Sequence, residues 1–421
     1  MKAPMTTRSR PQLSVRDRSS YGQRFFTRLK LSRRSYLFEK LQREEKKDFG
    51  FSEIWLWIKM DLKYLLLSLQ SSYTAWNQTK DVIRDEYGLS GIKQLVRMLY
   101  IVLVQKNKLK HFYKILLFKD ENWKRADQFT YRIAVLQDQL AVGTFPVEKR
   151  LIDDKLQFFE YCKRQGLRTP NVFAFGDADQ FEFIDKEQIA NMKCDLFVKH
   201  RIGGEGLDCI ILRYDENNYF LTNGNSFQKE QLIEGLKSLY SGRGAYVVQP
   251  RLQNHDSWEK WTPGSLATCR IVSARNPANE KQIIPLFGAF RMPVEGLDTD
   301  NHSQGGLAAP ISMQDGELGR ALTLKNLNGK YEFDKHPQTN ARITGAKIPY
   351  WNKILDYTVQ VHSQFKSCFV GWDLTLTNEG CIVIEGNITW AAGSYEIPWQ
   401  DSLMNTDYPW LHERWCEKVG I

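Results

Sequence analysis

GWDLTLTNEGCIVIEGN, residues 371–387, is the stretch of the chain that decides the fold. It reads as two apolar strands joined by a turn at residues 378–380, since asparagine and glycine favour turns. Side chains alternate along a strand, so Glu385 and Asn387 share one face, and pairing of the strands lets Asp373 join them. Two carboxylates and an amide oxygen are ligands that Mg²⁺ takes alongside phosphate oxygens. The alternative is a polar hairpin end, but a carboxylate that closes an apolar run needs a partner.

A lysine and a glycine-rich turn follow another apolar strand. Lys199 comes directly after residues 196–198, and glycines follow at Gly203, Gly204 and Gly206. Glycine lets backbone N–H groups approach a polyphosphate, and lysine adds a point charge. The spacing matches neither of the common glycine-rich phosphate motifs. Alone, the segment is more typical of a hairpin turn with a solvated lysine, but counted with the hairpin it favours the metal interpretation.

Two arginines lie on apolar strands further along the chain. Arg270 lies within residues 269–272 and Arg291 ends residues 288–291. A guanidinium binds phosphate or carboxylate through a planar fork, and a buried arginine must be paired. A structural salt bridge is therefore the alternative for each. Two such arginines on neighbouring strands, near a metal-binding hairpin, favour an anion site.

Composition indicates a globular protein of about two or three packed units, because 421 residues exceed one ordinary core. The hydrophobic fraction of 42% and the charged fraction of 25% are ordinary. The seven cysteines are scattered and form no C-x-x-C pair, which argues against a disulfide framework and a zinc ribbon. We find no signal peptide and no apolar run long enough to span a membrane, and we expect a cytoplasmic protein.

Positive charge is concentrated at the N-terminal end. Residues 1–140 carry 28 Lys and Arg against 14 Asp and Glu, whereas the net charge of the whole chain is only +9. We interpret residues 1–35 as a basic flexible arm and residues 36–144 as a helical domain with apolar stripes. Such stripes either dock on a bilayer surface or partner, or, more often, line a helical bundle. Nucleic-acid binding is not expected of the slightly acidic remainder and would belong to the arm.

From about residue 145, helices and strands alternate and mix, which indicates α+β lobes behind the helical domain. We expect helices at residues 147–165, 186–192, 228–240 and 354–365. We expect strands at residues 172–174, 196–198, 209–212, 246–249, 268–274, 283–292, 370–376 and 381–385.

These pieces, in this order, resemble the ATP-grasp superfamily over roughly residues 145–395. Asp154-Lys155 looks like the pair that opens its nucleotide-binding region, Lys199 like its second ATP lysine, and residues 203–206 like its mobile glycine loop. Gln249, Pro250 and Leu252 lie where its hinge reads adenine. The segment from Arg291 to Asn301, Ser303, Gly305 and Gly306 resembles the substrate segment of its glutamate ligases, and Asp373, Glu385 and Asn387 resemble its metal signature.

The sugar-transfer-associated ATP-grasp family is the most similar group, through residues 263–270, 305–311 and 371–373. Two features depart from the pattern: Gln249 replaces a frequent acid at the hinge, and residues 388–393 lack the usual Pro-Gly ending. These departures concern the shape of the substrate pocket rather than metal binding.

The resemblance implies an ATP-grasp fold with a small lobe at residues 145–248 and a large lobe at residues 249–421. It implies an ATP- and Mg²⁺-dependent ligase that joins a carboxylate to an amine through an acyl phosphate. Arg270 and Arg291 would act in catalysis, and the substrates would be a sugar-linked acid and an amino acid. The alternatives are a phosphotransferase acting on a hydroxyl and a non-catalytic nucleotide-binding module. Contact of the basic N-terminal region with a membrane surface is also considered.

Overall fold

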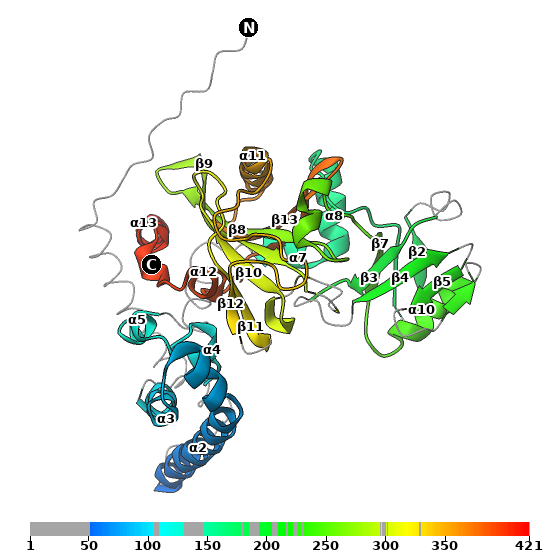
Figure 1. The fold of residues 1–421 in the computed structure, drawn as a ribbon. Coiled ribbons are helices and arrows are strands. Elements are labelled where there is room, and N and C mark those ends of the chain that lie inside the picture. The colour runs from blue at the N-terminus through cyan, green and yellow to red at the C-terminus, as the bar shows by residue number, and fades with distance from the viewer. Residues whose placement is uncertain are drawn as a thin grey trace.

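The structure is a computed structural model with a helical N-terminal region and two lobes, each built on one antiparallel sheet (Figure 1). It describes residues 51–104, 109–129, 146–177, 180–184, 193–203, 209–215, 218–221, 226–228, 231–294, 296, 300, 302–327 and 330–420. The predicted arm at residues 1–35 and the predicted helix at residues 186–192 lie outside these residues. The predicted α+β class with a helical N-terminal region is confirmed.

The helical region comprises α2 (Phe51–Tyr87), α3 (Gly91–Leu99), the π-helix η1 (Tyr100–Val104), α4 (Lys110–Lys114) and α5 (Asp120–Trp123). The predicted apolar stripes of residues 95–116 largely pack inward, as the bundle interpretation predicts: Met98, Phe112, Ile115 and Leu116 are all buried in one core. On α2 the side chains of residues 51–65 lie outside what the structure describes, and Leu66 is exposed. None of the helices in the described residues is both long and apolar enough to cross a bilayer.

The small lobe holds a sheet with the strand order β2-β1-β7-β3-β4-β5-β6. Its strands are β1 (Ala174–Gly176), β2 (Phe181–Phe183), β3 (Leu196–His200), β4 (Ile210–Asp215), β5 (Asn218–Leu221), β6 (Ser226–Gln228) and β7 (Tyr246–Pro250). Helix α10 (Leu232–Tyr240) packs on this sheet through Leu232, Leu236 and Tyr240.

The large lobe holds a sheet with the strand order β12-β11-β10-β9-β8-β13-β14. Its strands are β8 (Thr268–Asn276), β9 (Asn279–Met292), β10 (Leu307–Ile311), β11 (Ala321–Leu327), β12 (Lys330–Phe333), β13 (Phe369–Thr377) and β14 (Gly380–Asn387). Its helices are η3 (Asp256–Trp261), η4 (His302–Gln304), α11 (Trp351–Ser363), α12 (Gly393–Trp399), η5 (Leu403–Asn405) and α13 (Tyr408–Val419). This sheet carries every arginine and carboxylate of the predicted metal and anion site.

Helices α7 (Pro146–Asp153) and α8 (Lys155–Arg164) lie between the two sheets (Figure 1). Phe158 of α8 belongs to the core of the large lobe, whereas Phe159 packs with Val247 of the small lobe. The prediction of one helix over residues 147–165 is wrong at a single point. Asp154 leaves the helical conformation, and its side chain accepts hydrogen bonds from the first backbone N–H groups of α8, as an N-cap does.

Several other predicted boundaries shift; β9, for example, begins at Asn279 and not at residue 283. The strand expected at residues 172–174 is β1, two residues later, and the helix expected at residues 228–240 begins only at Leu232, because residues 226–228 pair as β6. The helix expected at residues 354–365 is α11, which begins at Trp351.

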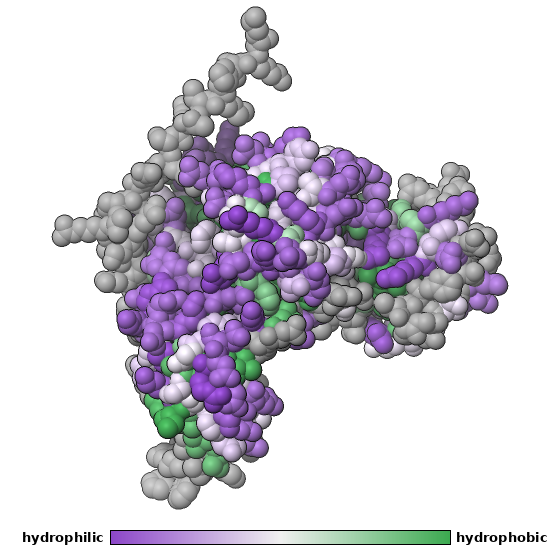
Figure 2. Space-filling model, in the orientation of Figure 1, coloured by the Kyte–Doolittle hydropathy of each residue, from purple (hydrophilic) through white to green (hydrophobic). Residues whose placement is uncertain are grey.

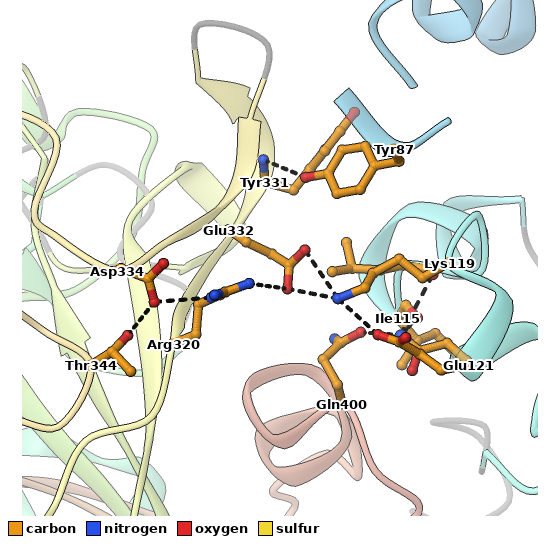
Figure 3. Close-up of polar contacts among 12 residues, drawn as sticks. Tyr87, Ile115, Lys119, Glu121, Arg320, Tyr331, Glu332, Asp334, Thr344 and Gln400 are labelled. Atoms are coloured by element: carbon orange, nitrogen blue, oxygen red, sulfur yellow. Dashed lines mark hydrogen bonds and ion pairs between the residues drawn. The ribbon is translucent and has the colours of Figure 1, made fainter. Parts of the chain in front are cut away.

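The helical region packs against the outer strands of the large sheet. Leu322 of β11 and Tyr331 of β12 are buried in the core of the helical region. Figure 3 shows the polar contacts beside this core, in which Lys119 Nζ lies 3.0 Å from Glu332 Oε1. The Asn122 amide donates to Gln400 Oε1 at 2.7 Å. Apolar burial and polar contacts therefore fix the helical region to the large lobe.

Candidate functional site

The hairpin quoted at the start of the sequence analysis forms as predicted, by strands β13 and β14. Thr377 pairs with Gly380 at the turn, and Asp373 pairs with Glu385 at the far end. A bulge follows Asp373, so the ladder shifts by one residue there. The Asn387 amide donates to Glu385 Oε1 at 3.4 Å. The structure thus brings the three predicted metal ligands together at one end of the hairpin.

Asp373 is held by the two predicted arginines. Arg270 lies opposite it on β8 and donates through Nε to Oδ1 and through Nη2 to Oδ2, the latter at 2.6 Å. Arg291 of β9 donates through Nη1 to Asp373 Oδ2 at 3.2 Å. Burial acts to raise the pKa of Asp373, but the two guanidinium groups outweigh it and hold that pKa below its usual range. The salt-bridge alternative considered for both arginines is therefore present in the structure.

A third carboxylate joins this cluster through Arg291. Its Nη2 donates to Asp300 Oδ1 at 3.3 Å, and Thr268 Oγ1 donates to the other oxygen of Asp300. Burial raises the pKa of Asp300, although Arg291 acts against it. The buried Arg291 Nε has no hydrogen-bond acceptor among the described residues. A buried donor without an acceptor is costly, so this atom marks a place where an anionic ligand would be stabilised.

Lys199 reaches the same cluster from the small lobe. It lies on β3, and its side chain is buried. Burial, together with the nearby Lys155 ammonium, lowers the pKa of Lys199 to about 8. Glu385 and Asp373 act in the opposite direction, which shows that Lys199 lies within their electrostatic reach. The lysine therefore interacts electrostatically with the acidic hairpin of the large lobe.

The other predicted lysine, Lys155, lies at the start of α8. Its Nζ donates to the carbonyl oxygen of Gly203 at 2.6 Å, and its backbone N–H donates to Arg201 O at 3.0 Å. Arg201 also forms an ion pair with Asp154 at 2.9 Å, and Asp154 caps α8. This pair fixes the end of β3 against α8, and sequence reasoning missed Arg201 because nothing local distinguishes it from a solvated residue.

The predicted hinge residues lie at the end of strand β7 and just after it. Gln249 is buried and pairs with Phe197 of β3, and its side chain donates to Pro170 O at 3.5 Å. Pro250 ends the strand, and Leu252 is partly buried two residues later. The chain therefore passes from the small sheet to the large lobe at this point.

The predicted substrate segment lies against β11. Gly305 has a φ of 116°, which favours glycine, and its carbonyl oxygen accepts a bond from Thr323 at 3.1 Å. His302 contacts Leu322 O at 3.1 Å, and burial followed by the charge of Arg291 lowers the pKa of His302 to about 3. Gly306 is buried. The side chain of Ser303, and Asn301, Gly204 and Gly206 altogether, lie outside what the structure describes.

The donor set of the hairpin fits a hard cation that also binds phosphate. Asp373 and Glu385 are adjacent carboxylates, and a cation between them would relieve their repulsion. In the part of the chain that the structure describes, no group of three or more His, Cys, Asp or Glu side chains is placed to hold a metal. Two carboxylates and one amide are the smaller set that suits Mg²⁺ when nucleotide oxygens complete it. Sequence reasoning missed Thr268, but this residue could have been predicted, because it lies two residues before Arg270 and therefore on the same face of the strand.

Comparison with known proteins assigns the family. The profile of the sugar-transfer associated ATP-grasp family matches residues 145–408, and the chain belongs to this family. No curated protein matches. The resemblance stated from the motifs is therefore confirmed, and the fold of the two lobes is the ATP-grasp fold.

Solved structures that are similar to this chain include three ligases. VanG D-Ala:D-Ser ligase from Enterococcus faecalis is 12% identical, covers 66% of this chain and 64% of its own, and has a TM-score of 0.39. A D-alanine–D-alanine ligase from Bacillus anthracis is 13% identical over 70% of this chain and 76% of its own, with a TM-score of 0.36. An L-amino acid ligase from Bacillus licheniformis is 12% identical over 59% of this chain, with a TM-score of 0.33. The chain spans only 43% of that ligase.

Proposed function

We propose that this chain is an ATP-dependent ligase that joins a carboxylate to an amine through an acyl phosphate. One observation carries the proposal. Arg270 and Arg291 of the large lobe pair with the acidic hairpin of Asp373 and Glu385, and the buried Lys199 of the small lobe interacts electrostatically with both carboxylates. Membership of the ATP-grasp family supports a nucleotide between these groups.

The reaction needs activation because a carboxylate is a poor electrophile. The substrate carboxylate attacks the γ-phosphorus of ATP, the bond to the bridging β–γ oxygen breaks, and ADP leaves. The amine then attacks the acyl carbon and displaces phosphate. This chemistry asks the protein mainly for positioning and charge stabilisation.

The cationic side chains have distinct tasks in this scheme. Lys155 and Lys199 bind phosphate oxygens of ATP from the small lobe. Arg291 directs its unpaired buried Nε, and Arg270 its guanidinium edge, at the transferring phosphoryl group and the acyl phosphate. Both arginines are fixed by Asp373, so their donors are oriented before the substrate arrives.

The hairpin residues Asp373, Glu385 and Asn387 would hold Mg²⁺. When bound, the ion supplies charge neutralisation for the phosphate oxygens. Gln249, Pro250 and Leu252 would line the adenine side, since the backbone there joins the lobes. Asn301, Ser303 and the backbone of Gly305 and Gly306 would contact the acyl substrate.

The substrate class follows from the family. Its description as sugar-transfer associated supports a sugar-linked acid, such as a uronic acid, with an amino acid or amine as the second substrate. All seven cysteines are free thiols, as in reducing compartments, which supports action in the cytoplasm.

Product analysis tests the proposal. Phosphate release is measured with ATP and Mg²⁺ across uronic acids paired with amino acids, and products are analysed by mass spectrometry. An amide with stoichiometric ADP and phosphate is expected. ADP with a stable phosphorylated hydroxyl and no amide would establish the phosphotransferase instead. Nucleotide binding without turnover on any pair would favour the non-catalytic module.

Glu385→Ala should abolish this turnover while leaving the fold intact, because it removes one of two carboxylates from the metal set. Glu379→Ala is the matched control: it lies in the turn of the same hairpin and its side chain is 84% exposed. The measurement is phosphate release with melting curves of both variants. Full activity of Glu385→Ala with Mg²⁺ would show that the metal assignment is wrong.

A further inference from the structure

Exposed apolar side chains gather on the helical region. Of the eleven large apolar side chains exposed in the described part of the chain, seven belong to α2, α3 and η1. We call these seven the α2/α3 apolar face: Leu66, Leu67, Leu69, Tyr73, Ile92, Val96 and Tyr100. Figure 2 shows apolar residues at this end of the molecule, away from the lobes.

The spacing gives each helix an outward stripe. Leu66, Leu69 and Tyr73 recur at i, i+3 and i+7 on α2, and Ile92 and Val96 lie four residues apart on α3. Ile92 is 78% exposed and Tyr73 is 60% exposed. A hydrogen bond joins the two helices beside these stripes: the indole of Trp76, which follows Tyr73 on α2, donates to the carbonyl oxygen of Gly91, which precedes Ile92 on α3, at 2.6 Å. Exposed apolar side chains gathered on neighbouring helices are typical of an interaction site.

Positive charge predominates in the sequence that flanks this face. Residues 87–119 contain seven Lys and Arg and no Asp or Glu, although Arg97 pairs with Asp120 and Lys119 with Glu332, whereas α2 contains four Lys and Arg against five Asp and Glu. Residues 1–50, which lead into α2, contain 14 Lys and Arg against five Asp and Glu. The acidic residues at the end of α2 are partly neutralised, since Arg84 lies 2.8 Å from Asp81 and 2.9 Å from Asp85. An anionic partner is therefore favoured.

We infer that the α2/α3 apolar face docks the protein on an anionic phospholipid surface. Helices that lie in a membrane interface combine an apolar stripe with Lys and Arg beside it. Each basic residue near an anionic surface adds attraction, and tyrosine and tryptophan favour the headgroup level. A second copy of the chain would instead bring like charge against this basic region. Nucleic acid would leave the leucine, isoleucine and valine side chains without a partner.

Docking there would also orient the catalytic lobes. Besides the Lys119–Glu332 contact of Figure 3, Arg125 lies 2.7 Å from Asp401 of the large lobe. Leu322 connects the two parts directly, because its side chain lies in the core of the helical region and its carbonyl oxygen contacts His302. Strand β11 thus connects the helical region that would dock with the segment at residues 302–306. This inference does not depend on the proposed ligase reaction.

Vesicle co-sedimentation of the full chain tests the inference. Vesicles of phosphatidylcholine alone are compared with vesicles of phosphatidylcholine and phosphatidylglycerol at about 70:30 in moderate salt. We expect binding to the anionic vesicles that weakens on raising salt, and little binding to the neutral ones. The double variant Ile92→Glu, Val96→Glu should reduce partitioning to the anionic vesicles about tenfold or more. It removes two apolar side chains that would enter the membrane, and it adds two negative charges that the anionic surface repels.

Two further variants serve as controls. Val419→Glu makes the same kind of change at an exposed position on α13, and its partitioning should equal that of the wild type. Leu66→Glu with Tyr73→Glu repeats the change on α2, in case the α3 variant fails to fold, as judged by circular dichroism. The inference is overturned if the wild-type protein does not bind anionic vesicles, or if folded variants of the α2/α3 apolar face bind them as strongly as Val419→Glu does. So would a dimer, seen by light scattering, that the face variants dissociate without any vesicle binding by the wild type.

Discussion

If Lys199 binds ATP as proposed, ATP affinity should depend on pH. Burial and the neighbouring Lys155 ammonium lower the pKa of Lys199 to about 8, so the side chain is roughly 90% protonated at pH 7 and roughly 10% at pH 9. A charged hydrogen bond contributes about 2 kcal/mol, so the neutral lysine binds phosphate poorly. ATP affinity should therefore fall between about fivefold and tenfold from pH 7 to pH 9.

Isothermal titration of the Mg²⁺–ATP complex at pH 7, 8 and 9 measures this change. The phosphate groups change charge near pH ~6, below this range. Lys199→Arg is the control, because a guanidinium stays charged throughout and its affinity should vary little. A flat wild-type profile, or a parallel fall in the arginine variant, would refute the reasoning.

A loss of protein stability caused by Lys199 would not explain weaker ATP binding at pH 9. The pKa of Lys199 is lower in the folded protein than in the unfolded chain, so between about pH 8 and 10.5 the unfolded chain binds more protons. The contribution of Lys199 to stability therefore rises with pH in this window. A loss of binding at pH 9 would report the charge of the site.

Two further predictions concern the framework of the site. Asp154→Ala removes the N-cap of α8 and the partner of Arg201, and should lower the free energy of unfolding by about 1–3 kcal/mol, measured by urea titration and contradicted by an unchanged midpoint. Gly386→Ala would place a methyl group 2.7 Å from the Trp372 ring and 2.9 Å from Ile152, so it should lower the free energy of unfolding by about 1–3 kcal/mol in the same assay. A urea midpoint equal to that of the wild type would show that the packing there is looser.

Local sequence was sufficient where the structure depends on neighbours in the chain. The hairpin of residues 371–387 forms from its own alternation and turn residues, so its strands and the pairing of Asp373 with Glu385 were predictable. The partners of Asp373 could only be suspected. Arg270 and Arg291 meet it because β8 pairs with both β9 and β13, and that register is set by contacts across about a hundred residues.

Strands β2, β5, β6, β10, β11 and β12 were not predicted, and β10 shows a physical reason. Strand β10 contains Pro310, which reads as a break in a strand because proline lacks a backbone N–H. The sheet tolerates it because β11 pairs with β10 only at Leu307 and Ala308, so the proline lies beyond that ladder. Its carbonyl oxygen still accepts a bond from Gly319 at 2.9 Å. Residues near the site that sequence reasoning overlooked, such as Asp300, depend on this long-range arrangement.

The charges of the site explain why its arginines can serve both structure and chemistry. Lys199, Arg270 and Arg291 face three carboxylates, those of Asp300, Asp373 and Glu385, so the cluster nearly neutralises itself without a ligand. Asp373 is the shared member, because it accepts hydrogen bonds from both guanidinium groups. If Asp373 also ligates a cation, its hold on the arginines weakens, and their donors become more available to a phosphoryl group. Binding of the cation and of the anionic substrate would then reinforce each other, which is what a site built to use ATP requires.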